Sequence, residues 1–183
     1  MRATLDAAQS LKNDYTLICS GIGKAGAAAG VATAVAKADK PFDAVAVIGF
    51  AAGSLGFKQG DVVAPNRAVY HDCDVPEGFI PELTDPYTLA GNDDITAFTG
   101  DSFINANSAT EIMERFSTTR ALFDMEIMAV AIAVRDYADA IPLLAVKYIS
   151  DVPQSGHNEW SYEDFANAYS DFSPLLSKIE NLL

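Results

Sequence analysis

Residues 44–50 form an uninterrupted apolar run, AVAVIGF, and this run restricts the fold more than any other feature of the sequence. A strand without a polar face must be covered on both sides, as it is in a parallel sheet between two layers of helices. Residues 143–149, LLAVKYI, form a second run of this kind. We therefore expect an α/β fold: a single three-layer domain over residues 1–183, with a mostly parallel or mixed central sheet flanked by helices.

Shorter segments complete this alternation of strands and helices. Apolar periodicity predicts the helices, and short apolar runs between Gly, Pro and Asp residues predict the strands. The predicted helices are residues 2–11, 24–37, 108–116, 125–138 and 161–182, the last interrupted near Pro174, and the other predicted strands are residues 15–19, 61–70, 95–99 and 121–123. Residues 74–94 are rich in Pro and Gly and predict a loop too long to be a simple connection.

The acidic composition excludes several classes of partner. The chain has 25 acidic and 12 basic residues and a net charge of −13, and such a surface repels nucleic-acid phosphates and anionic lipids. No apolar run approaches the ~18 residues that a membrane span requires. The two cysteines, Cys19 and Cys73, do not suggest a disulfide framework and fit a reducing compartment. We expect a cytoplasmic protein without nucleic-acid or membrane partners.

Residues 21–26, GIGKAG, match the G-x-G-x-x-G pattern of dinucleotide-binding folds. That site also needs a carboxylate about 20 residues further on, at the end of the next strand, to hold the ribose. Here the next strand ends in residues 48–51, IGFA, and offers no carboxylate. The two histidines, His71 and His157, show no metal-ligand spacing. We expect neither a nucleotide cofactor nor a bound metal.

Polar side chains at the carboxyl ends of the predicted strands mark the place where open parallel sheets bind ligands. Glu126 follows one strand and opens an apolar helix, and Asp151 ends the run of residues 143–150. Each has a structural alternative, because Glu126 fits a helix cap and Asp151 fits a turn residue before Pro153. Two acids at the ends of neighbouring strands nevertheless indicate a site, because one can hold a proton while the other binds a polar group.

Several longer stretches of the sequence match one known family in the right order. They are SGIGKAGAA (20–28), AAGSL (51–55) with GDVV (60–63), YHDCDV (70–75), GDSFIN (100–105), DMEIMAVA (124–131), and KYISDV (147–152) with SYEDF (161–165). Together they resemble the purine nucleoside phosphorylase/nucleosidase superfamily, and within it the 5′-methylthioadenosine/S-adenosylhomocysteine nucleosidases. The resemblance implies a nucleoside phosphorylase-like fold. It also implies hydrolysis of the N-glycosidic bond of a purine nucleoside, with release of adenine and without a cofactor.

The resemblance implies a role for each residue at a matching position. Asp151 would be the general acid at purine N7, oriented by Ser150, and Glu126 would accept hydrogen bonds from the sugar hydroxyls. The other implied substrate contacts are Met125 on the ribose, Phe103 stacked on the purine, the Ile104 backbone at the adenine edge, Gly53 after the second strand, and Tyr162 near the 5′ substituent. In the family a neighbouring subunit closes the pocket, so a homodimer is implied, with the 74–94 loop as a contributor.

The sequence departs from the family pattern in three places. The family activates the attacking water with a glutamate in an N-terminal segment, whereas residues 1–4 hold no glutamate and Asp6 is the nearest carboxylate. Ala51 stands where serine or threonine is usual, and the 74–94 loop is shorter. Two alternatives to hydrolysis follow. One is a phosphorylase, although no arginine that would clamp phosphate occurs in residues 4–66, and the other is a homologue that binds a nucleoside or adenine without efficient turnover.

Overall fold

A seven-stranded mixed sheet forms the centre of the protein, in the strand order β2-β7-β1-β6-β5-β3-β4. The computed structural model describes residues 14–76, 80, 84–137, 141–156 and 162–183. The strands are β1 (Val45–Gly53), β2 (Val62–Val63), β3 (Pro65–Tyr70), β4 (Tyr87–Thr88), β5 (Asp93–Thr99), β6 (Ala121–Asp124) and β7 (Leu143–Asp151). The pairs β1–β7, β5–β6 and β3–β5 are parallel, and the remaining pairs are antiparallel.

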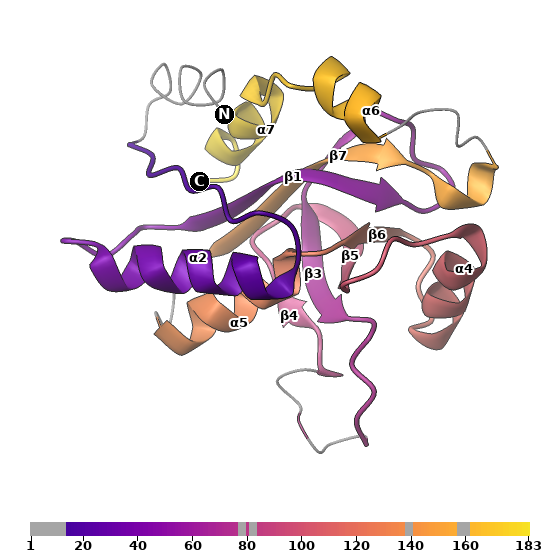
Figure 1. Cartoon of the computed structure of the whole chain (residues 1–183), viewed down its shortest axis with the longest axis horizontal. Helices are drawn as coiled ribbons and strands as arrows, with labels where there is room; N and C mark the ends of the chain where they lie inside the picture. Colours follow the sequence, from indigo (N-terminus) through magenta and orange to yellow (C-terminus); the bar gives the residue numbers. More distant parts are fainter. Residues whose placement is uncertain (1–13, 77–79, 81–83, 138–140, 157–161) are drawn as a thin grey trace.

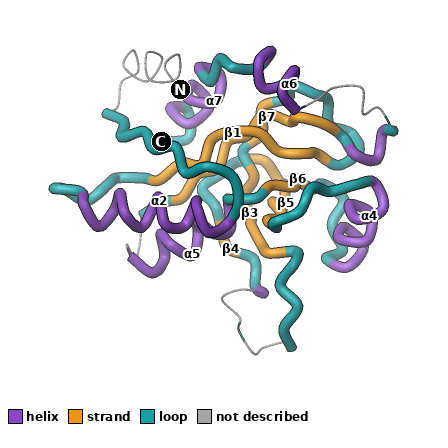
Figure 2. Tube along the Cα trace, in the orientation of Figure 1, coloured by secondary structure: helices purple, strands orange, loops and turns teal. Residues whose placement is uncertain are grey.

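Helices cover the sheet from both sides, which confirms the predicted three-layer α/β fold (Figure 1). α2 (Lys24–Lys37) and α5 (Ile127–Tyr137) lie side by side on one face, while α6 (Tyr162–Ala168) and α7 (Ser173–Glu180) lie on the other. α4 (Ala106–Arg115) stands at one end of the sheet beside the short 3₁₀ helix η1 (Pro153–Ser155) (Figure 2). The two long apolar strands therefore have apolar neighbours on both faces, as their sequences require.

Small residues on α2 allow this helix to pack closely. Its sequence, KAGAAAGVATAVAK, has only Ala27 and Val31 fully buried, and both join the apolar cluster that contains Met128 and Ala131 of α5. A Cβ on Gly26 would lie 2.6 Å from the Ser20 carbonyl oxygen, so only glycine allows the preceding segment to cross the helix at this distance. This close crossing holds Ser20 against the first turn of α2.

Several predicted elements differ from those in the structure. Residues 15–19 have no regular secondary structure and belong to no strand of the described part of the chain. The predicted strand 61–70 is two strands, because the Ala64 N–H donates to Asp93 Oδ2 at 2.7 Å and Pro65 has no N–H to offer a sheet. The 74–94 loop contains β4, which pairs with β3. The predicted helix 2–11 lies outside the described residues.

The C-terminal region confirms the predicted interruption of the helix. α6 ends at Ala168 and α7 begins at Ser173, with Pro174 in its first turn. Proline is well placed there because the first helical N–H groups have no intrahelical partner. In the described ranges, no helix is long and apolar enough to cross a membrane.

Candidate functional site

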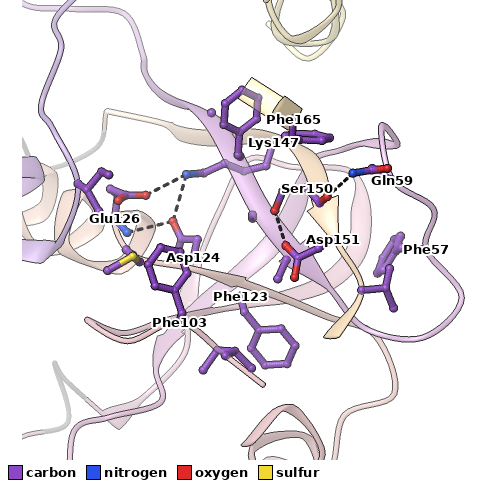
Figure 3. Close-up of a pocket in the computed structure, with 18 of the residues that line it drawn as sticks. Phe57, Gln59, Phe103, Phe123, Asp124, Glu126, Lys147, Ser150, Asp151 and Phe165 are labelled. Carbon is purple, nitrogen blue, oxygen red and sulfur yellow. Dashed lines mark hydrogen bonds and ion pairs between the residues drawn. The ribbon is translucent and has the colours of Figure 1, made fainter. Parts of the chain in front are cut away.

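A cavity of about 980 Å³ is lined by residues 47–52 of β1, the end of β6 and the last part of β7. Its polar wall contains Asp124 and Glu126 from the β6–α5 junction, Lys147, and Ser150 with Asp151 at the end of β7 (Figure 3). Glu126 and Asp151 therefore line one cavity. The expectation that they end neighbouring strands is wrong, because β1 lies between β6 and β7. A volume near the upper end of the range typical of ligand pockets accommodates a molecule of nucleoside size.

Asp124 caps α5, and Glu126 does not. One oxygen of Asp124, Oδ2, accepts from the N–H groups of Glu126 (3.1 Å) and Ile127 (2.8 Å) at the start of the helix. The other, Oδ1, accepts from Thr99 Oγ1 at 2.6 Å. The sequence left open whether Glu126 is a cap or a ligand-binding group, and the structure assigns the capping role to Asp124, so the Glu126 carboxylate is directed to other partners.

Lys147 holds the two carboxylates together. Its Nζ lies 3.2 Å from Glu126 Oε2 and 3.3 Å from Asp124 Oδ2, and its side chain is only 2% exposed. Burial alone would lower the pKa of Lys147, but the negative charges of Asp124 and Glu126 raise it above its ordinary value. The amine is therefore charged at neutral pH and fixes the orientation of Glu126 at the cavity wall.

The second oxygen of Glu126 is held by the glycine-rich turn before α2. Glu126 Oε1 accepts from the Gly23 N–H at 3.1 Å. Gly21 and Gly23 have φ values of 77° and 94°, a region that favours glycine. The G-x-G-x-x-G pattern, which a dinucleotide site does not explain, thus forms a turn whose N–H group binds a side chain of the cavity.

Asp151 is in a different environment at the end of β7. Ser150 Oγ donates to Asp151 Oδ1 at 2.6 Å, and the Ser150 carbonyl accepts from Gln59 Nε2 at 2.9 Å. The pairing of β1 with β7 shifts register here, so that Ala52 lies opposite Asp151 and Ser150 has no opposite residue. Such a bulge interrupts the alternation of side chains, and it allows Ser150 and Asp151 to face the same cavity (Figure 3).

The apolar wall contains several of the residues predicted to contact substrate. Phe103, Ile104 and Met125 all line the cavity, and Phe103 is 81% exposed at its edge. Gly53 does not line it; this glycine is buried against Ile149 and Phe57. The Tyr162 side chain lies outside the described residues, although its backbone begins α6.

Sequence reasoning missed Asp124 and Lys147 as members of the site. A signal for Lys147 was present, because a lysine stands alone within the apolar run LLAVKYI, and a lysine is almost never fully buried unless it is paired. Asp124 ends a buried strand one residue before Met125, but only the three-dimensional contacts distinguish its capping role from that of Glu126.

Comparison with known proteins identifies the family. Residues 9–180 match the phosphorylase superfamily. The chain belongs to that superfamily. It is 34% identical over 175 residues to the 5′-methylthioadenosine/S-adenosylhomocysteine nucleosidase of Haemophilus influenzae strain PittGG, with 83% of this chain and 74% of that protein covered. The corresponding protein of strain 86-028NP is 32% identical over 177 residues, with the same coverage of 83% and 74%.

Solved structures of the superfamily confirm the fold. The structure from Neisseria meningitidis in complex with methylthio-immucillin-A has a TM-score of 0.71 at 23% identity, covering 90% of this chain and 79% of that chain. The structure from Colwellia psychrerythraea in complex with adenine has a TM-score of 0.68 at 23% identity, covering 89% of this chain and 74% of that chain. Both carry the name 5′-methylthioadenosine/S-adenosylhomocysteine nucleosidase. The predicted superfamily and the α/β fold are thus confirmed.

Proposed function

We propose that the protein hydrolyses the N-glycosidic bond of a purine nucleoside, such as 5′-methylthioadenosine or S-adenosylhomocysteine, and releases adenine. The observation that supports this most strongly is that two carboxylates on one cavity wall have different hydrogen-bond partners. Glu126 is held by Lys147 and the Gly23 N–H, whereas Asp151 accepts a hydrogen bond from Ser150 Oγ at the end of β7. The first arrangement suits a carboxylate held in a fixed position to bind sugar hydroxyls, and the second suits a carboxyl group that meets the base.

The two carboxylates have complementary tasks in this reaction. Asp151 delivers a proton to N7 of the purine, which makes the base a better leaving group as the glycosidic bond breaks. Glu126 accepts hydrogen bonds from the sugar hydroxyls, and these bonds strengthen as the ribosyl C1′ gains positive charge. Phe103 lies at the cavity edge, where an aromatic ring can stack on the base. Lys147 and Asp124 fix Glu126 rather than contact the substrate.

Hydrolysis also needs a base that activates the attacking water. Asp124 lines the cavity, but its oxygens already accept from Thr99, the α5 N–H groups and Lys147. Among the described residues that line the cavity, the only other carboxylates are Glu126 and Asp151. This observation favours a second candidate function, in which the protein binds a nucleoside or adenine and turns it over slowly. Asp6, the other candidate base, lies outside the described residues.

An adenine-release assay tests the proposed function. We expect purified protein incubated with 5′-methylthioadenosine to release free adenine, measured by HPLC. Glu126→Gln should lower the rate and weaken nucleoside binding together, because the neutral amide stabilises the developing positive charge less well. Asp94→Asn, which changes an exposed carboxylate paired with Arg67, is the matched control and should behave as wild type.

The outcome of this assay separates the two candidates. Binding of adenine without its release from any purine nucleoside would reject the hydrolase and leave a binding protein. If adenine is released and Asp6→Ala is silent, another group or a bound water activates the nucleophile.

We also propose that a second copy of the chain closes the cavity. Three exposed apolar residues line the cavity: Ile22, Leu55 and Phe103. Large apolar side chains that cluster on a surface indicate an interaction site. We expect the apolar surface around residues 70–79 to pack against the second copy, and the structure describes this segment up to Pro76. Light scattering at micromolar concentration should give twice the 19.5 kDa of one chain, and a monomer would contradict the shared pocket.

A further inference from the structure

The start of α2 is held by carboxylates that come from distant parts of the chain. α2 has no acidic residue in its first turn and no side-chain N-cap of its own. Instead, the Gly23 N–H donates to Glu126 Oε1 at 3.1 Å, and the Lys24 N–H donates to Asp101 Oδ1 at 3.0 Å. The unpaired N–H groups at a helix N-terminus favour negative charge. The helix end and the two carboxylates therefore hold one another in place.

The Lys24 side chain joins a network of charges around the same helix end. Its Nζ lies 2.8 Å and 3.0 Å from the two carboxylate oxygens of Asp72, and 3.3 Å from Asp101 Oδ2. The Asp101 N–H in turn donates to Asp72 Oδ2 at 3.0 Å. We refer to Lys24, Asp72 and Asp101 as the Lys24 network. None of the three lines the cavity, so the network acts from behind its wall.

Lys24 and Asp72 remain ionised at neutral pH. Burial alone would lower the pKa of Lys24, but Asp72 and Asp101 raise it above its ordinary value. Burial alone would raise the pKa of Asp72, but the hydrogen bonds from Lys24 and the Asp101 N–H lower it. An isolated exposed ion pair contributes little to stability, but charges that close a network restrict one another. The main effect of this network is therefore to fix the position of the first residues of α2.

We infer that the Lys24 network positions Glu126. Asp101 fixes the Lys24 N–H, and Gly23 is the adjacent residue, so the network sets the direction of the Gly23 N–H. That N–H holds Glu126 Oε1, while Lys147 holds Oε2. Glycine suits this position because its φ is 94°, a conformation that residues with a side chain rarely adopt. The inference rests on the proposed function only in that Glu126 binds the sugar.

Ligand binding to the Lys24→Met variant tests this role. The variant keeps an apolar chain of similar length but loses the charge. We expect formycin A, a nucleoside whose carbon–carbon glycosidic bond resists hydrolysis, to bind about tenfold more weakly, as for a lost hydrogen bond to a charged group. Adenine, which lacks the sugar, should bind within about twofold of wild type. Lys24→Arg should restore formycin A binding. The control is Arg67→Met, which breaks the exposed pair with Asp94.

A second measurement on the ligand-free protein keeps the inference separate from the proposed function. In Lys24→Met, hydrogen exchange of the Gly23 amide, followed by NMR, should accelerate, because its bond to Glu126 is no longer held. Unchanged exchange, or equal weakening of adenine and formycin A, would overturn the positioning role. If wild type binds neither ligand but the exchange still accelerates, the proposed function fails and the positioning of Glu126 stands.

Discussion

Replacing Asp151 by asparagine should slow adenine release about 10²–10⁴-fold, the usual contribution of a general acid. The amide has the same size and can still accept from Ser150 Oγ, which lies 2.6 Å from Asp151 Oδ1 in the wild type. It cannot deliver a proton to purine N7. We therefore expect a fall in kcat with little change in the affinity for adenine, measured by initial rates on 5′-methylthioadenosine and by calorimetry.

Two companion variants sharpen this result. Ser150→Ala should have a smaller effect, because it removes the hydrogen bond that orients Asp151 but leaves the proton donor in place. Asp94→Asn changes an exposed carboxylate outside the cavity and should leave the rate unchanged. Equal rates for Asp151→Asn and wild type would reject Asp151 as the acid, whatever the fold.

The fold was predictable because the strongest signals in the sequence are local. A short apolar run bounded by turn residues is typical of a strand covered on both sides, and residues 44–50 and 143–149 became the adjacent strands β1 and β7. Residues 15–19 show the limit of this reasoning. Their apolar pattern suits a strand, yet they pair with no strand of the described chain, because pairing depends on a partner elsewhere in space.

The candidate site was predictable in part, for the same reason. Acids at strand ends are visible in the sequence, and both Glu126 and Asp151 line the cavity. The partners that fix Glu126 are the Gly23 N–H and Lys147, which are far from it along the chain and therefore not visible as a local pattern. The backbone direction at the β6–α5 junction decides which of the two nearby acids caps the helix. Here Asp124 is the cap, because its carboxylate accepts from the first N–H groups of α5.

The largest effect on stability should come from Lys147→Met. The variant removes the cation that pairs with both Asp124 and Glu126 and leaves their negative charges facing each other. The site is buried, because the side chains of Lys147 and Asp124 are 2% and 0% exposed. Breaking a buried ion pair by removing one partner typically costs about 3–5 kcal/mol. We expect a loss of this size in the free energy of unfolding, measured by urea denaturation at pH 7. Lys178→Met, which removes a partly exposed lysine paired with Asp93, is the control and should lose about 1 kcal/mol or less.

The pH of the measurement and a second substitution make this prediction specific. Because the pKa of Lys147 is raised in the folded protein, its contribution is complete below the unfolded value of 10.5 and is lost only as pH rises through the higher folded value. The loss in Lys147→Met should therefore be the same at pH 7 and pH 9. Adding Glu126→Gln should recover part of it, because one unpaired negative charge is removed. A loss as small as that of Lys178→Met would show that Asp124 and Glu126 do not depend on the buried amine.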